Sequence, residues 1–295
     1  MTSPSPSPSP TKNPDPMPPR RLRLDAELVR RGLARSREHA TELIAAGRVR
    51  VSGAAATKPA TGVTTDVAIV VSEDSTRPDY VSRGGHKLAG ALAVFEPEGL
   101  VVAGRRCLDA GASTGGFTDV LLQRGARQVV AVDVGYGQLA WRLRSDERVV
   151  VFDRQNVREL TAEAIGGPVD LVVGDLSFIS LRLVLDALLG VTEPDGDLAL
   201  MVKPQFEVGK ERVGKGGVVR DPGLRAEAVG SVADEAARRG WGARMVATSP
   251  LPGPSGNVEF FLWLRKGPAA IDADDINSAV RGAGPSGVPN ERVEP

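Results

Sequence analysis

The chain has 295 residues, with 37 lysine and arginine residues against 37 aspartate and glutamate residues, so its formal net charge is zero. Hydrophobic residues make up 41% and charged residues 25% of the sequence, which is ordinary for a globular protein and excludes a wholly disordered, collagen-like or coiled-coil chain. The single cysteine, Cys107, excludes an internal disulfide. With only His39 and His86 as histidines, a cysteine- or histidine-based metal centre is also disfavoured, and we predict no metal site.

No apolar run approaches the roughly 18 residues that a membrane-spanning helix needs. The best candidate, 171–191, contains Asp175, Arg182 and Asp186. The N-terminus opens with Ser-Pro repeats in place of the basic patch and apolar core of a secretory signal. We therefore expect a cytoplasmic protein with no membrane partner.

Composition divides the chain into segments. Residues 1–19 carry Ser-Pro pairs and further prolines that cannot build a core, and residues 267–295 contain few large apolar side chains, so both ends are predicted to be disordered. A polar stretch at 73–82 is predicted to be a linker. The sequence thus predicts a small domain at 20–72 and a larger domain at 83–266.

Charge is unevenly distributed along the chain. Residues 20–60 hold ten basic and four acidic side chains, a net charge of +6, which the rest of the chain balances. A small basic domain on a mildly acidic body is typical of a nucleic-acid anchor on an enzyme. From charge alone, a solvated basic face without a partner is an equal alternative.

The small domain is predicted to contain two short helices and a hairpin. Apolar residues over 22–33 follow helical spacing, and Gly32 stands where a C-cap glycine would end the helix. Ser36 is the expected N-cap of a second helix, which Gly47 closes. Residues 49–71 then read as two short strands around a turn, which completes a small α+β domain.

Three segments of this domain resemble the S4 domain, an RNA-binding fold: Arg23-Leu24-Asp25, Ser36-Arg37, and Gly47 to Gly53. In that family the second helix and the following loop present arginine and lysine to RNA phosphates, which supplies affinity but little sequence specificity. The resemblance implies RNA contacts at Arg23, Arg35, Arg37, Arg48, Lys58 and, in the larger domain, Arg83. A solvated surface charge is the alternative for each arginine, and is favoured for Arg30 and Arg31.

The larger domain alternates short apolar runs with helical patterns. Strands are expected at 106–109, 129–133, 149–152, 171–173 and 198–202. Helices are expected at 117–124, 139–144, 181–189 and 224–239. This order predicts an α/β fold with a doubly wound, Rossmann-like sheet.

The first of these strands leads into a glycine-rich turn that runs from Asp109 to Phe117. Small residues there let the backbone approach a ligand at the carboxyl edge of the sheet. The spacing is neither a dinucleotide fingerprint nor a phosphate loop, but it resembles the D-x-G-x-x-x-G-G loop of class I S-adenosylmethionine (SAM)-dependent methyltransferases. Asp133 ends the second strand, where a carboxylate can bind two ribose hydroxyls, a need that SAM and NAD share. Close helix-to-strand packing is the alternative role of Gly115 and Gly116.

The resemblance implies SAM as the cofactor, held at the ends of the first four strands. The implied residues are Asp109, Gly111, Ala112, Ser113, Gly115, Gly116, Phe117, Asp133, Asp153, Asn156 and Asp175. Asn156 has helix capping as an equal alternative. Phe178 is expected to pack in the protein in preference to stacking on a base or on the cofactor.

Lys203 directly follows an apolar strand, where a lysine is costly to bury unless it is paired or functional. Further motifs stand at 82–88, 173–180, 201–207 and 256–261. Together with both domains, they make the chain resemble, over about residues 20–266, the S4-fused ribosomal RNA 2'-O-methyltransferases that are often labelled hemolysin TlyA.

The Lys-Asp-Lys-Glu tetrad of ribose 2'-O-methyltransferases falls on Lys87, Asp175, Lys203 and Glu259. The resemblance makes Lys203 the base that takes the proton of a ribose 2'-hydroxyl as it attacks the sulfonium methyl in line. Lys87 would hold the ribose and favour the neutral amine of Lys203 by charge repulsion. The two carboxylates orient the amines but favour their charged forms, and the sequence leaves open which influence prevails.

The family's substrates are cytidine 2'-hydroxyls, so the implied partners are 16S or 23S ribosomal RNA in the 30S subunit, the 50S subunit or both. We expect a monomer. A glycine-rich segment at 206–221 is predicted to be a mobile loop over the substrate site, with Lys210, Arg212 and Lys215 suited to phosphate contact. Two alternatives stay open: a membrane-active hemolysin, which no spanning or strongly amphipathic segment supports, and a non-catalytic RNA-binding ribosome-assembly factor, against which the intact tetrad argues.

Overall fold

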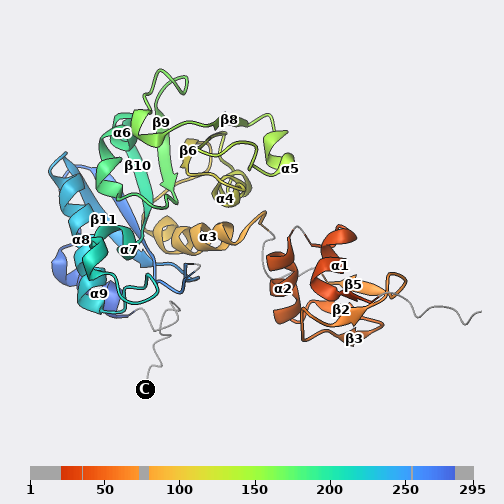
Figure 1. Ribbon diagram of the computed structural model, residues 1–295. Helices are drawn as coiled ribbons and strands as arrows, with labels where there is room; N and C mark the ends of the chain where they lie inside the picture. The colour runs from red at the N-terminus through yellow and green to blue at the C-terminus, as the bar shows by residue number, and fades with distance from the viewer. Residues whose placement is uncertain (1–20, 35, 73–79, 254, 283–295) are drawn as a thin grey trace, which may run out of the picture. The chain divides into compact units, whose positions relative to one another are not determined.

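The computed structural model describes residues 21–34, 36–72, 80–253 and 255–282 (Figure 1). The chain divides into two compact units, Met1–Asp79 and Tyr80–Pro295. The arm predicted at 1–19 lies outside the described residues, as does most of the linker predicted at 73–82.

Within residues 21–34 and 36–72, the N-terminal unit has two helices and two small antiparallel sheets. Its elements are β1 (Leu22–Arg23), α1 (Leu24–Arg30), α2 (Arg37–Ala45), β2 (Val49–Val51), β3 (Ala54–Ala55), β4 (Gly62–Val63) and β5 (Ile69–Val71). Strand β1 pairs with β4, and the other sheet has the order β3-β2-β5. The core is formed by Leu24, Leu28, Leu43, Ile44 and Val49, which are nearly or fully buried.

The predicted start of the second helix and the predicted ends of both helices are confirmed. Ser36 is the N-cap of α2, and its hydroxyl accepts a hydrogen bond from the backbone N–H of His39 at 3.1 Å. Gly32 and Gly47 follow the two helices with φ values of +71° and +69°, a region that glycine enters at little cost. The prediction of a helix from residue 22 is wrong, because Leu22 pairs in a strand with Val63.

The C-terminal unit is built on one seven-stranded sheet of order β11-β12-β10-β9-β6-β7-β8 (Figure 1). Its strands are β6 (Arg106–Ala110), β7 (Gln128–Asp133), β8 (Val149–Asp153), β9 (Val169–Gly174), β10 (Thr192–Val202), β11 (Trp241–Thr248) and β12 (Phe260–Lys266). All neighbouring strands from β10 to β8 run parallel, whereas β12 is antiparallel to both β10 and β11. The predicted doubly wound sheet is confirmed.

Helices cover both faces of this sheet. They are α3 (Arg83–Phe95), α4 (Gly116–Gln123), α5 (Trp141–Arg144), α6 (Leu185–Gly190), α7 (Pro204–Glu207), α8 (Pro222–Ala237) and α9 (Ala273–Arg281), with short 3-10 turns η1 (Glu96–Glu98), η2 (Val157–Glu159), η3 (Leu181–Leu183) and η4 (Lys210–Arg212). Alternate strand residues enter two separate cores, since side chains along a strand point to opposite faces. Leu108 joins a core with α6 and α8, whereas Cys107 faces α3 and α4.

Cys107 is fully buried in β6, and burial raises the pKa of its thiol to about 12, so it is an unreactive core residue.

The structure corrects the predicted C-terminal boundary. Within the segment 267–295 that the sequence predicts to be disordered, α9 packs Ile276 and Val280 into the core beside α8. Asp272 caps this helix by accepting hydrogen bonds from the N–H groups of Asp274 and Asp275. Apolar residues spaced four apart in an otherwise polar segment are enough to dock one short helix.

The start of the domain also lies earlier than predicted. Tyr80 and Val81, which were assigned to the linker, are only 3% and 4% exposed and belong to the core beneath α3. Among the helices that the structure describes, none combines the length and apolar character needed to cross a bilayer.

Candidate active site

The functional residues gather where parallel strands end. The chain leaves β6 toward β7 on one side, while β9 pairs on the other side of β6, so the strand order reverses between β6 and β9. Open α/β sheets bind ligands at such a switch point, outside the carboxyl ends of the strands. The loops after β6, β7, β9 and β10 all emerge at this edge.

Glycines shape the loop after β6 chiefly through packing. A Cβ at Gly111, where φ is +87°, would lie 3.0 Å from the carbonyl oxygen of Asp175 on the neighbouring loop. A Cβ at Gly115 would overlap Leu143, and one at Gly116 would overlap Ser82 at the start of α3. Gly115 and Gly116 therefore have the packing role that was the alternative interpretation, and their contact with a cofactor stays a prediction.

Two carboxylates anchor this loop in different ways. Asp109 is fully buried and accepts hydrogen bonds from the N–H and the hydroxyl of Thr118, at 2.8 and 2.7 Å. Burial, with Asp175 and Asp133 nearby, raises the pKa of Asp109 to about 7. Asp133 is half-buried and accepts from the N–H groups of Ser113 and Gly135, at 2.8 and 2.7 Å.

Some predicted cofactor residues have structural roles. Phe117 is 4% exposed and packs against Phe261 with a centroid distance of 5.8 Å, so the structure places its ring in the core and not at the open edge. Ala112 is also buried. Asn156 caps η2 by accepting a hydrogen bond from the N–H of Arg158 at 3.1 Å, which is the capping role given as its alternative. Asp153 accepts from Arg144 at 2.8 Å.

The four tetrad residues form two ion pairs. Lys203 Nζ lies 2.5 Å from Asp175 Oδ1 and also donates to the Ser177 hydroxyl at 2.8 Å. Lys87 Nζ donates to Glu259 Oε2 at 2.6 Å. Lys203 and Lys87 are each 7% exposed and Glu259 is 1% exposed, so these charges are held away from bulk water.

Strand register explains why these residues share one face. Val202 pairs with Phe260, so the next positions, Lys203 and Glu259, continue the same antiparallel register. Val202 and Phe260 face the core with α8, and therefore Lys203 and Glu259 are directed to the opposite face, where α3 carries Lys87.

Several buried side-chain oxygen atoms at this edge accept no hydrogen bond from the protein. In the part of the chain that the structure describes, the buried side-chain atoms without a hydrogen-bond partner are Asp109 Oδ1, Asp175 Oδ1, Gln205 Oε1 and Glu259 Oε1. Asp175 Oδ1 contacts Lys203 Nζ as an ion pair without hydrogen-bond alignment. Unsatisfied buried acceptors are rare in native proteins, and their concentration beside one sheet edge is typical of a site that receives donors from a ligand.

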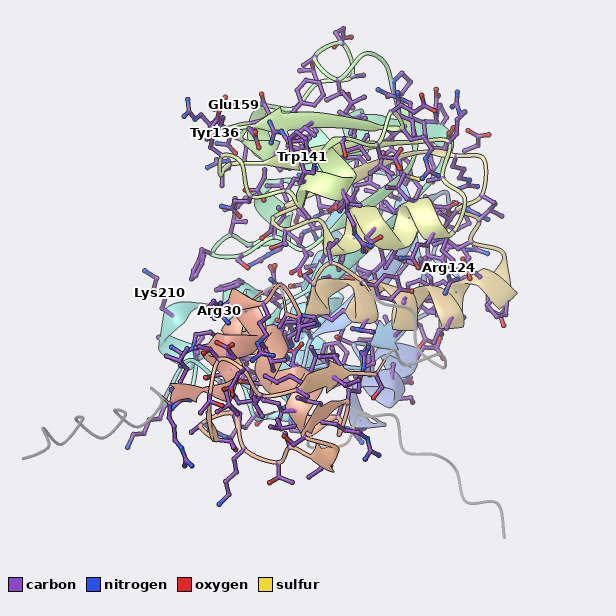
Figure 2. All side chains as sticks on the ribbon, turned by 90° about the vertical axis from the view of Figure 1, so that its right-hand side faces the viewer. Arg30, Arg124, Tyr136, Trp141, Glu159 and Lys210 are labelled. Carbon is purple, nitrogen blue, oxygen red and sulfur yellow. The ribbon has the colours of Figure 1, made fainter. Side chains whose placement is uncertain are left out.

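Exposed aromatic rings surround the same edge. Phe178 is 91% exposed with φ at +65°, and its ring lies 5.4 Å from that of Phe206, so the expectation that it packs in the protein is wrong. Beyond Asp133, Tyr136 and Trp141 are 67% and 80% exposed (Figure 2). Neither residue was predicted to belong to the site, although Tyr136 stands three positions after the strand-ending Asp133, which was a usable signal.

The segment 206–221 has fixed contacts that its glycine content did not predict. Asn257 accepts a hydrogen bond from the N–H of Val219 and donates to the carbonyl of Gly217, at 2.9 and 2.8 Å. Val219 is buried against Ala228 of α8. Arg212 pairs with Glu227, whereas Lys210 is exposed (Figure 2). Asn257 lies in the motif at 256–261, but the sequence did not predict that it bridges to the 206–221 segment.

On the N-terminal unit, two predicted RNA contacts share one carboxylate. Arg23 donates to both oxygens of Asp25, at 3.0 and 2.9 Å, and Arg37 donates to Oδ2 at 3.0 Å. These hydrogen bonds lower the pKa of Asp25 to about 2, and the one from Arg23 has the largest effect. The two guanidinium groups are each more than half exposed and held side by side.

The other basic residues differ in their environment. Arg30 and Arg31 both pair with the buried Glu27, whose pKa they lower to about 2, so their role in the fold is structural. Lys58 is exposed, and Arg48 donates to the carbonyl of Ser72 at 2.9 Å. Arg83, in the first turn of α3, contacts the carbonyl of Pro252 at 3.5 Å. Arg35 lies outside the described residues.

Known proteins match both units. Residues 80–266 match the FtsJ-like methyltransferase family, and residues 22–69 match the S4 domain. A protein of Mycobacterium tuberculosis named 16S/23S rRNA (cytidine-2'-O)-methyltransferase TlyA is 63% identical over 265 residues, which cover 90% of this chain and 97% of that protein. Hemolysin A of Brachyspira hyodysenteriae is 35% identical over 240 residues, or 81% of this chain and 98% of that protein.

A solved structure from Streptococcus thermophilus, of a protein described as a hemolysin, superposes with a TM-score of 0.70 at 36% identity, covering 88% of this chain and 94% of that one. The methyltransferase fold and the N-terminal S4 domain predicted from the sequence are thereby confirmed. The chain belongs to the TlyA family, in which an S4 domain precedes an FtsJ-like methyltransferase domain.

Proposed function

We propose that this chain transfers a methyl group from SAM to the ribose 2'-hydroxyl of cytidine in ribosomal RNA, in the 16S RNA, the 23S RNA or both. The observation that carries the proposal is the convergence of two lysine–carboxylate pairs, Lys203–Asp175 and Lys87–Glu259, beside the carboxyl edge of a methyltransferase sheet. The name of the M. tuberculosis relative supports the choice of RNA and nucleotide.

The residues at the switch point fit SAM. Asp133 is half-buried and oriented by two backbone amides, as a carboxylate that binds ribose hydroxyls should be. Asp175 lies in the same group of carboxyls, since it and Asp133 both help to raise the pKa of Asp109. Such a cluster favours a positively charged ligand. SAM, when bound, supplies an electrophilic methyl group on a sulfonium.

Lys203 is the proposed base. Its Nζ, in the neutral form, would accept the proton of the ribose 2'-hydroxyl as that oxygen takes the methyl group, and the sulfur of SAM would leave as a neutral thioether. The ammonium that results is stabilised by Asp175 and Ser177, which already contact this nitrogen. Stabilisation of charge that develops in the transition state is the usual way in which fixed carboxylates assist proton transfer.

Lys87 has a supporting role in this proposal. Its ammonium is fixed by Glu259 and lies on α3, which faces the same side of the sheet as Lys203. From there it can hold the ribose by donating a hydrogen bond to one of its hydroxyl oxygens. Glu259 keeps one oxygen without a hydrogen-bond partner, which leaves it able to accept from the substrate.

The S4 domain is the proposed RNA anchor. Arg23 and Arg37, held together by Asp25, present two guanidinium groups to solvent, and exposed Lys58 and half-buried Arg48 add further charge. Contacts of this type neutralise phosphates and make binding salt-dependent. We extend the proposal to Arg35 and Arg83 on the family resemblance.

The direct test is transfer of radiolabelled methyl from SAM to isolated 30S and 50S subunits, with the label located by ribose-sensitive primer extension. We expect label on the ribose of a cytidine in one or both subunits. Label on a base, or no label on either subunit, would contradict the proposed function.

A further inference from the structure

Two loops at the carboxyl edge each carry one member of the Lys203–Asp175 pair. The first loop, 175–181, follows β9 and contains Asp175, Ser177 and Phe178. The second connection, 203–207, follows β10 and consists of Lys203 and the short helix α7. Because the base and the groups that orient it lie on different loops, transfer depends on how these loops are held relative to each other.

A buried carboxylate joins the two loops. Glu207, at the end of α7, is 6% exposed. Its Oε2 accepts a hydrogen bond from the Ser180 hydroxyl at 2.5 Å, and its Oε1 accepts from the N–H of Leu181 at 2.7 Å. Arg182 lies 3.5 Å from the same carboxylate and donates to the Glu207 carbonyl at 3.1 Å.

All these partners of Glu207 come from the segment that continues the first loop. Burial raises the pKa of Glu207, while the hydrogen bonds from Ser180 and Leu181 and the charge of Arg182 act in the opposite direction. The carboxylate is therefore stabilised by the 180–182 segment, and that segment is in turn fixed by the carboxylate.

The first loop needs such an anchor because its backbone is strained. Phe178 has φ at +65°, a region that a residue with a side chain rarely adopts, and its ring is almost fully exposed. Phe178 stands two positions before Ser180, whose hydroxyl donates to Glu207. It directly follows Ser177, whose hydroxyl accepts from Lys203. Release of Ser180 would let the loop relax and would move Ser177 away from the amine.

We propose that Glu207 is a positioning residue for methyl transfer: it ties the loop of Asp175, Ser177 and Phe178 to the loop of Lys203, and so fixes the direction of the Lys203 amine. This inference rests on the proposed function, in which Lys203 is the base. Glu207 touches none of the tetrad side chains in the hydrogen bonds described above and acts through Ser180 and Leu181.

The test compares kcat and KM of Glu207→Ala and Glu207→Gln with the full-length protein, on whichever ribosomal subunit the wild type methylates. Glu207→Ala should lower kcat about 10- to 100-fold, since small misplacements of reacting groups have effects of this size. Its KM for SAM should stay within about twofold, because Asp133 and the loop after β6 are untouched. Glu207→Gln keeps one acceptor and should recover most of the lost rate.

Asp197→Asn is the matched control for a merely structural effect. Asp197 is a fully buried carboxylate on β10, the strand that leads to Lys203, but it binds Arg105, Trp263 and Arg265 away from the site. This variant should lose thermal stability and keep its kcat per folded molecule. An unchanged kcat in Glu207→Ala would overturn the inference. It would also be overturned if Glu207→Ala raised the KM for SAM and lowered kcat no more than Asp197→Asn does.

A second readout does not require turnover. Lysine acetylation by acetic anhydride, followed by mass spectrometry, reports how accessible the Lys203 amine is. Lys87 is the internal reference, because it lies on α3 and is paired with Glu259. Glu207→Ala should raise the labelling of Lys203 several-fold relative to Lys87. Equal labelling in wild type and variant would overturn the inference. If Glu207→Ala does not fold, Ser180→Ala removes one of the two hydrogen bonds and should show a smaller shift in the same direction.

The outcomes separate this inference from the proposed function. Absence of methyl transfer by the wild type would contradict the function, while the labelling ratio would still decide whether Glu207 holds the Lys203 loop. Transfer by the wild type together with an unaffected Glu207→Ala variant would contradict the positioning role alone.

Discussion

The part of β10 that pairs with β12 has buried charge at its start and directly after its end. Where it begins to pair with β12, fully buried Asp197 accepts hydrogen bonds from Arg105, Trp263 and Arg265, at 2.6, 2.7 and 2.8 Å. Where it ends, Lys203 meets a carboxylate whose Oδ1 is in an ion pair but lacks an aligned hydrogen bond. The carboxylate of Asp197 therefore has protein donors for both oxygens, whereas the carboxylate that meets Lys203 has an oxygen without an aligned protein donor.

The same contrast appears between the two domains. In the S4 domain, Asp25 and Glu27 are each held by two arginines, and their pKa values are lowered to about 2. At the methyltransferase edge, the pKa of Asp109 is raised to about 7 and one of its oxygens has no hydrogen-bond partner. Buried charge that only stabilises a fold is paired, and buried charge reserved for a ligand is left incomplete at some cost in stability.

The largest expected effect on stability is at the paired end of β10. Asp197→Ala leaves two arginines and an indole N–H without their acceptor, so the free energy of unfolding should fall by about 3–5 kcal/mol. Urea denaturation measures this change. Methyl transfer per folded molecule should be unaltered, and a specific loss of kcat would break the proposed separation between the two ends.

Lys87 and Glu259 test the same contrast inside the site. Lys87→Met strands a carboxylate that is 1% exposed and should cost roughly 2–4 kcal/mol of unfolding free energy. The double variant Lys87→Met/Glu259→Gln should recover most of that stability, because no charge stays unpaired, yet should not recover methyl transfer. Thermal unfolding and transfer assays on the same preparations check both statements, and recovery of activity in the double variant would contradict the role of this pair.

Asp109 gives a pH-dependent version of the comparison. Its pKa of about 7 lies above the ordinary value of 3.8, so its contribution to stability is full below about pH 4 and is lost as the pH rises toward 7. Asp109→Asn keeps an acceptor for Thr118 but cannot ionise. Between pH 5 and pH 8 the wild type should therefore lose more thermal stability than Asp109→Asn, and parallel pH profiles would refute the raised pKa.

The smallest expected effect is at the surface of the S4 domain. Lys58→Glu should leave the unfolding free energy within about 0.5 kcal/mol, because the side chain is exposed. If Lys58 contacts one phosphate, subunit affinity should fall and the slope of log affinity against log salt should shrink by about one. Arg30→Gln is a control, because Arg30 forms an ion pair with buried Glu27. This variant should lower the unfolding free energy more than it changes the salt slope.

The sequence was more informative about candidate site residues than about the contacts that surround them. Lys203 was detectable because a lysine directly after an apolar strand breaks the pattern of the strand, and Asp133 because it ends one. The packing of Phe117 and the capping by Asn156 depend on which neighbours the fold brings near, and a local pattern does not carry that information.

Elements outside the alternating pattern were missed for a similar reason. Strands β11 and β12 follow a long helix and pair antiparallel, so the periodic strand–helix rule did not reach them. Helix α9 lies in a polar segment in which Ile276 and Val280 provide the buried contacts. Glu207 belonged to a recognised motif, but its link to Ser180 joins positions 27 residues apart.

The measurement that tests the central claim most directly is methyl transfer by Lys203→Ala beside SAM binding by the same variant. If the partly satisfied end of β10 holds the base, the variant should lose about 10²- to 10⁴-fold in kcat while its affinity for SAM and for the ribosomal subunit stays within about threefold. Substantial turnover by Lys203→Ala, at a rate near that of the wild type, would contradict the account.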